Sequence, residues 1–158
     1  MNRQSVLANR LREVILDGKW IANTNFRDQL DSMDWEVATR AVGNLNTIAL
    51  LAQHIHYYIG GIKEAFTHGQ LIIRDRYSFD FAPMISQDQW ESFLDDFWKD
   101  TEDLAILIET LPEGKLEEDF IKAEYGSYAR NINGMIEHSY YHLGQVVLLK
   151  KTIETMKV

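Results

Sequence analysis

The 158-residue chain contains no cysteine and only two prolines. The absence of cysteine excludes disulfide bonds, thiolate zinc sites and cysteine nucleophiles, so any metal ion must be held by nitrogen or oxygen atoms. The scarcity of proline leaves most of the chain free to form long helices, because proline breaks helix interiors. No segment has about 18 consecutive apolar residues, and the N-terminal segment lacks the continuous apolar stretch of a signal peptide. We therefore expect a cytoplasmic protein with no membrane-spanning segment.

Basic residues are also scarce, since 16 Lys and Arg stand against 24 Asp and Glu and give a net charge of −8. This balance repels a phosphate backbone, so we expect no binding to nucleic acid. Hydrophobic residues make up 46% of the chain and charged residues 25%, as in ordinary globular proteins. A chain of this length can bury a continuous core, and residues 1–158 are predicted to form one domain.

Apolar residues recur at helical spacing in four long segments. The first is closed by Asp17-Gly18, the second spans residues 44–66 with a possible irregularity at Gly60-Gly61, the third runs from Ser86 to Leu111, and the last runs from Tyr128 almost to the C-terminus. Ser86 and Gln89 fit a capping box, and Asn23-Thr24-Asn25 is expected to cap a shorter helical piece. Residues 34–44, 67–85 and 115–127 are expected to be connections. The pattern predicts an all-α protein, a four-helix bundle with two long crossover connections and almost no strand.

The third segment carries a group of large aromatic residues, and two interpretations of them are open. The group consists of Trp90, Phe93, Phe97 and Trp98. It can form a self-association face, which would make a homodimer possible. Aromatic residues on one side of a helix more often face the bundle core.

The last segment contains the stretch "NGMIEHSYYHLGQVVLLKK", with His138 and His142 four residues apart. Residues at this spacing share a helix face with their Cβ atoms about 5–6 Å apart, close enough for both imidazoles to bind one metal ion. Gln145 follows one turn later. The same spacing also arises by chance on solvated faces, but the apolar surroundings indicate that at least one ring is half-buried and needs partners for its nitrogens.

Two familiar metal motifs are missing around this pair. Ser139 stands where the metalloprotease pattern His-Glu-x-x-His has its glutamate, and the Glu-x-x-His pattern of di-iron bundles does not occur. A third ligand can come from the stretch "LLAQHIHYYIGG", where helical periodicity slightly favours His56 over His54. The remaining histidine, His68, is expected to be exposed at a helix end beside Gly69.

Three passages together resemble the DinB/YfiT superfamily of small helical-bundle proteins. These are "NTIALLAQHIHYY", "GMIEHSYYHLGQ", which is similar to the family's His-x-x-x-His-x-Gly-Gln signature, and "LDGKWIANTNFRDQL". The resemblance implies a bundle in up-down-down-up order that binds one divalent metal ion through His54, His138 and His142. Three neutral imidazoles suit Zn²⁺, Ni²⁺ or another first-row ion, with Zn²⁺ and Ni²⁺ expected first. Residues that could then hydrogen-bond to these ligands are Tyr58, Glu137, Tyr141 and Gln145.

The resemblance also implies a function. Characterised relatives include metal-dependent S-transferases and isomerases that use small thiols such as bacillithiol, mycothiol or glutathione, so we expect a small-molecule substrate and a role in detoxification or stress response. The absence of cysteine suits a thiol that is supplied by a cosubstrate. The alternatives are a metal- or small-ligand-binding bundle without turnover, and a helical dimer whose histidines are vestigial.

Overall fold

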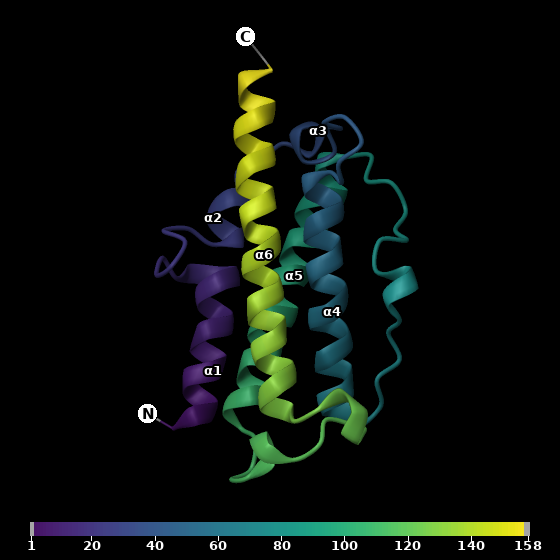
Figure 1. The fold of residues 1–158 in the computed structure, drawn as a ribbon. Coiled ribbons are helices and arrows are strands. Elements are labelled where there is room, and N and C mark those ends of the chain that lie inside the picture. The colour runs from purple at the N-terminus through teal and green to yellow at the C-terminus, as the bar shows by residue number, and fades with distance from the viewer. Residues whose placement is uncertain (1, 157–158) are drawn as a thin grey trace.

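The computed structural model describes residues 2–156, whose regular structure is helical throughout (Figure 1). The long helices are α1 (Arg3–Arg12), which continues through a π turn η1 (Glu13–Asp17), then α4 (Ile48–His68), α5 (Gln87–Glu109) and α6 (Tyr128–Thr155). The short elements are α2 (Phe26–Leu30), α3 (Trp35–Ala38) and the 3₁₀ turns η2 (Asp75–Tyr77), η3 (Lys115–Glu117) and η4 (Ala123–Tyr125). The described residues form no strand, only an isolated bridge between Asp119 and Ser127, so the all-α prediction is confirmed. None of these helices combines the length and apolar character needed to cross a membrane.

The four long helices pack side by side in a closed arrangement. Helices α1 and α4 each contact both α5 and α6. In Figure 1, α1 and α6 rise from the lower end of the bundle, whereas α4 and α5 descend from the upper end. Because α4 and α5 are parallel neighbours, the chain must return along the bundle between them. Residues 69–86, named here the crossover strap, make that return along the outer side of α4 (Figure 1).

Side-chain caps fix where the helices begin. Each cap accepts a hydrogen bond from the backbone N–H three residues later, which satisfies a donor that the helix itself leaves unpaired. The caps of α1, α2, α4, α5 and α6 are Asn2, Asn25, Thr47, Ser86 and Ser127. The predicted cap at Ser86 is thus confirmed, although Gln89 accepts from the N–H of Ile85 at 3.0 Å, one residue before the usual partner.

Two expectations about secondary structure are wrong. Helix α4 passes through Gly60 and Gly61 without interruption and ends at Gly69, whose φ of 70° terminates it in the left-handed region. Residues 34–44 are not only a connection, since they contain the single turn α3. Of the two glycines, Gly61 has a packing role, since a Cβ there would lie 2.5 Å from Ile73, whereas Gly60 faces open space.

The aromatic residues of α5 lie in the core. Trp90, Phe97 and Trp98 are buried and Phe93 packs partly buried against the same cluster. The indole N–H of Trp90 donates to the carbonyl oxygen of Met33 at 2.9 Å, and that of Trp98 donates to a carboxylate oxygen of Asp31 at 2.9 Å. These bonds tie α5 to the segment after α2. The four residues form no exposed self-association face.

Arg12 joins α1 to α5 by an ion-pair network. Its guanidinium lies 2.8 Å from Glu102 and 2.7 Å from Glu109, and its side chain is only 17% exposed. The hydrogen bonds from Arg12 lower the pKa of Glu109. Two carboxylates therefore share one cation, and removing that cation would leave two like charges facing each other.

We predict that Arg12→Met lowers the free energy of unfolding at pH 7 by about 1–3 kcal/mol, because it leaves the carboxylates of Glu102 and Glu109 unpaired at a partly buried contact. Urea unfolding followed by circular dichroism measures the change. The matched control is Lys99→Met, which removes an exposed cation that pairs with Asp103 within α5. An equal loss in both variants would contradict a special role for the Arg12 network.

Candidate metal centre

Three histidines from two helices meet at one point in the bundle. His54 comes from α4, and His138 and His142 come from successive turns of α6. One ring nitrogen of each lies within 4.8 Å of the others. His54 and His142 are buried and His138 is half-buried. The structure thus brings together the three histidines that the resemblance implied, and it places them close enough to bind one metal ion.

The distances between the facing nitrogens fit metal coordination. The Nε2 atom of His138 lies 3.2 Å from Nε2 of His54 and 2.9 Å from Nε2 of His142. Metal–nitrogen bonds of about 2.0–2.1 Å at angles between octahedral and tetrahedral values place two nitrogens about 2.9–3.4 Å apart. Two of the three nitrogen pairs therefore already have the separation that a shared ion would give them.

Hydrogen bonds to the opposite ring nitrogens fix two of the rings. Nδ1 of His54 donates to the carbonyl oxygen of Ser78 at 2.9 Å, and Nδ1 of His142 donates to Oε1 of Gln145 at 2.6 Å. In a neutral ring a proton on Nδ1 leaves the Nε2 lone pair free. Both lone pairs point toward Nε2 of His138, which has one hydrogen at most and cannot satisfy two acceptors. A cation at the centre of the cluster satisfies all three nitrogens together.

The surroundings keep the three rings neutral. Burial lowers the pKa of His54 and that of His142. Burial, with the neighbouring His142 and His54, lowers the pKa of His138 to about 4. Only the neutral imidazole has a lone pair for a metal, so at pH 7 the cluster is in the protonation state that ligation requires.

Aromatic rings pack around the cluster and position it further. Phe79 of the crossover strap stacks on His54 with centroids 4.0 Å apart and an interplanar angle of 8°. Tyr58 contacts His54 and His138 edge-on, and its hydroxyl donates to Asp75 at 2.8 Å. The strap is thus part of the site, although it contributes no ligand.

Of the four residues predicted to hydrogen-bond to the ligands, Gln145 does so and the other three do not. Tyr58 donates to Asp75 instead, and the exposed Glu137 faces Arg130 at 3.7 Å. Tyr141 is 64% exposed and contacts His142 only through its ring. The sequence did not predict the contact of His54 with Ser78, because the acceptor is a backbone carbonyl oxygen and no side-chain pattern indicates it.

The two other histidines lie outside the cluster. Nε2 of His56 lies 2.8 Å from Asp100 of α5, so the weak preference for His56 from periodicity is wrong. His68 ends α4 and lies 3.2 Å from Glu64, exposed as predicted. Ser139, which replaces the metalloprotease glutamate, is buried and donates to the carbonyl oxygen of Met135. Its hydroxyl is therefore engaged within α6.

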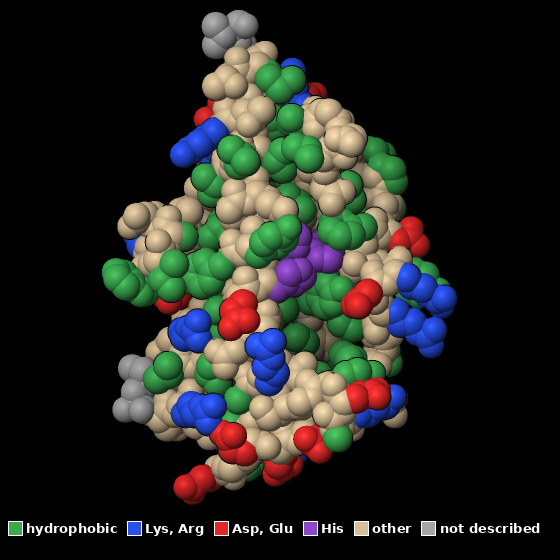
Figure 2. All heavy atoms as spheres, viewed as in Figure 1, with side chains coloured by type: hydrophobic (Ala, Val, Ile, Leu, Met, Phe, Trp, Pro, Cys, Tyr) green, Lys and Arg blue, Asp and Glu red, His purple; other side chains and the backbone are tan. Residues whose placement is uncertain are grey.

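The cluster borders open space on the α4–α6 face. A cavity of about 410 Å³ is lined by His138 together with Tyr58, Arg130 and Met135, among others. Figure 2 shows histidine side chains between α6 and α4, with hydrophobic side chains above them and a hollow below them. A small molecule in this cavity would reach the one histidine of the three that is not fully buried.

We predict that Gln145→Leu weakens metal binding about 10–100-fold, because it removes the acceptor that orients His142. Isothermal titration of the metal-free protein with Zn²⁺ measures the affinity. Gln145→Glu keeps an acceptor oxygen at this position and is expected to retain affinity. Equal affinity of the leucine variant and the unmodified chain would show that the hydrogen bond does not position the ring.

Comparisons of the chain with protein families, curated proteins and solved structures give no match. The resemblance to the DinB/YfiT superfamily therefore stays a prediction that rests on the residues quoted above. The function has to be argued from the geometry of the three histidines and of the cavity beside them.

Proposed function

We propose that this protein binds one divalent metal ion through His54, His138 and His142 and is a metal-dependent enzyme that acts on a small molecule. One observation carries the proposal: ring nitrogens of the three histidines lie within 4.8 Å of one another beside an open cavity. Two of the rings are already oriented by other hydrogen bonds, so the arrangement is built in advance of any ligand. Prearrangement of this kind is typical of metal sites.

The donor set indicates which ions fit. Three neutral imidazoles suit Zn²⁺, Ni²⁺ and other first-row divalent ions, and they suit Mg²⁺ or Ca²⁺ poorly because those ions prefer oxygen ligands. Three protein ligands are also the usual number in catalytic zinc sites, whereas structural sites have four. The cavity beside His138 is where a further ligand would lie.

Within this proposal the reaction is an S-transfer from a small thiol, as in the DinB/YfiT superfamily. A bound divalent ion lowers the pKa of a coordinated thiol, as it does that of water. The imidazoles of the cluster would hold the ion. Phe79 stacks on His54, Gln145 accepts from His142, and Arg130 brings a positive charge to the cavity wall. In such a transfer the sulfur–carbon bond forms, the leaving group departs from the carbon, and the thiol proton goes to solvent.

The order of the helices supports the same family. The resemblance implies an up-down-down-up bundle, and α1, α4, α5 and α6 follow that order in Figure 1. A metal-binding bundle without turnover is the alternative function. The cavity at His138 favours the enzyme, because a metal bound only for structure or storage needs no open space beside its ligands.

We predict that the purified chain takes up one divalent ion and that His54→Ala loses it, whereas His56→Ala retains it. The two histidines are two residues apart on α4, so the pair of variants is closely matched, and His56 pairs with Asp100 away from the cluster. Elemental analysis after dialysis measures the metal content. Loss of metal in His56→Ala with retention in His54→Ala would refute the ligand set.

We further predict thiol-transfer activity in the metal-loaded protein. The assay incubates it with bacillithiol, mycothiol or glutathione and with monochlorobimane, which becomes fluorescent when sulfur displaces its chloride. His142→Ala should reduce the enzymatic rate to background, because it removes one metal ligand. If no thiol reacts faster with the unmodified protein than with this variant while metal is bound, the non-catalytic alternative is favoured.

A further inference from the structure

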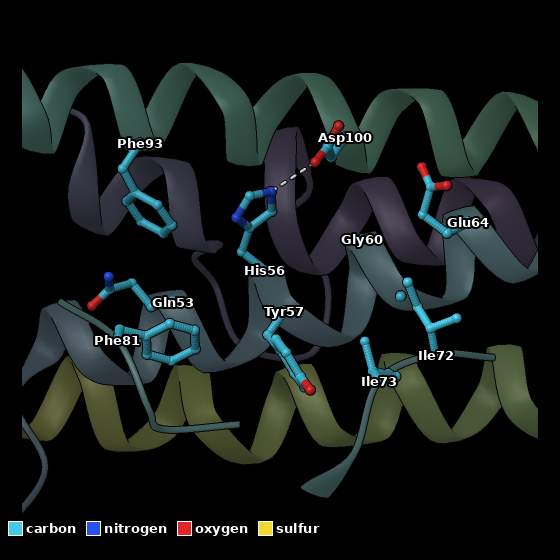
Figure 3. A pocket seen from close by; sticks show the side chains of 11 residues that line it. Gln53, His56, Tyr57, Gly60, Glu64, Ile72, Ile73, Phe81, Phe93 and Asp100 are labelled. Atoms are coloured by element: carbon cyan, nitrogen blue, oxygen red, sulfur yellow. Dashed lines mark hydrogen bonds and ion pairs between the residues drawn. The ribbon is translucent and has the colours of Figure 1, made fainter. Parts of the chain in front are cut away.

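A second pocket lies on the side of α4 that faces α5, away from the three-histidine cluster (Figure 3). It has a volume of about 370 Å³, within the usual range for small-ligand sites. Helix α4 contributes one wall, α5 contributes Phe93 and Asp100, and the crossover strap contributes Ile73 and Phe81. The pocket is largely apolar, with a few polar groups converging on it.

The strap is fixed firmly enough to serve as a wall. The hydroxyl of Tyr57 accepts from the backbone N–H of Arg74 at 2.9 Å and lies 3.1 Å from its carbonyl oxygen. A Cβ atom at Gly61 would lie 2.5 Å from the Cδ1 atom of Ile73, so only glycine allows this close approach. Gly60, by contrast, faces open space, since a Cβ there would meet nothing within 4 Å. Gly61 therefore allows the strap to approach α4 closely, and Gly60 leaves the space of the pocket unfilled.

A hydrogen-bonded cluster around Asp100 forms the part of the pocket next to α5. Asp100 accepts from Lys63 at 2.6 Å and from Nε2 of His56 at 2.8 Å. Burial would raise the pKa of Asp100, but the hydrogen bonds from Lys63 and His56 outweigh it and lower the pKa. Nε2 of His56 carries the proton that Asp100 accepts, and in the neutral form of the ring this leaves Nδ1 as an acceptor. Lys63 pairs with Asp100, and Glu64 also lines the pocket, so its charged groups give no site for an anionic ligand.

Two hydrogen-bonding groups at the aromatic end of the pocket have no partner within residues 2–156. They are Nδ1 of His56 and the side-chain amide of Gln53, three residues apart on the same face of α4. Figure 3 shows the free nitrogen of His56 directed toward Gln53 and Phe93, with the ring of Phe81 nearby. An unpaired acceptor and an unpaired amide beside aromatic rings are complementary to a flat molecule with a polar edge.

We propose that this pocket binds a neutral, planar aromatic amide or a cyclic molecule with the same –CO–NH– edge. Its N–H donates to Nδ1 of His56, its carbonyl accepts from the amide of Gln53, and its ring packs between the side chains of Phe81 and Phe93. The site is separate from the metal centre, because His54 and His56 project from different sides of α4. It does not depend on the function proposed above.

The test titrates benzamide into the purified protein and follows ¹H–¹⁵N correlation spectra. We expect saturable shifts of the Gln53 side-chain amide and of residues 72–81, with weaker binding of toluene, which has the ring but no polar edge. Gln53→Leu should weaken benzamide binding about tenfold, the loss expected for one hydrogen bond. If toluene binds as tightly as benzamide, the assignment of the polar edge is overturned.

Gly60→Leu tests the pocket itself. The new side chain enters open space and fills the site, so benzamide binding should disappear while the fold is kept. The matched control is Gly144→Leu, another helical glycine with open space around it, on α6 and outside the pocket. Thermal unfolding checks that both variants are folded. Absence of saturable shifts in the unmodified chain, or equal binding by the Gly60 variant, overturns the proposal.

Discussion

The parallel packing of α4 against α5 is the constraint on which most other features depend. Two consecutive helices that run in the same direction cannot be joined by a short turn, so the chain must travel the length of the bundle between them. That return path is the crossover strap, residues 69–86. The strap then supplies Ser78 and Phe79, which orient and cover His54, and Ile73 and Phe81, which line the second pocket. The crossover strap, which the helix order requires, is therefore part of both the histidine cluster and the second pocket.

Helix α4 is buried along two faces because it contacts both α5 and α6. This explains why two histidines that are two residues apart have different surroundings. His54 projects toward α6 and joins the cluster, whereas His56 projects toward α5 and pairs with Asp100. Side chains two residues apart on a helix point in directions about 200° apart, so His54 and His56 cannot serve one site. Each face of α4 therefore has its own polar group inside an otherwise apolar contact.

The helices and the last-helix pair could be predicted from the sequence, since both depend on local spacing. Helical periodicity gives the segments, and a separation of four residues places His138 and His142 on one face. The choice between His54 and His56 could not be made from periodicity, because a helix with two buried faces has no single apolar stripe to measure against. The resemblance of the surrounding residues pointed to His54, which the structure places in the cluster.

Contacts made by the strap were beyond the reach of the sequence for a different reason. Whether Ser78 meets His54 depends on the path of residues 69–86, and that path depends on packing between helices far apart in the chain. The same applies to Gly60 and Gly61, which look like a helix irregularity in the sequence. Only the position of Ile73 over Gly61 shows that one of them is needed for close approach. Local spacing therefore predicted the pair His138 and His142, and the resemblance added His54, but neither predicted the contacts that orient the rings.

The burial of the cluster has a chemical consequence for the proposed metal site. Charged imidazoles cannot be accommodated so close together in a desolvated site, and the lowered pKa of His138, about 4, expresses that cost. Near neutral pH none of the three rings is then an imidazolium, so binding of a metal ion would not have to remove that extra proton. The same burial removes alternative partners, since His54 and His142 already use Nδ1 within the fold. Three neutral rings, two of them oriented by hydrogen bonds within the fold, thus meet beside a cavity that is open only on the side of His138.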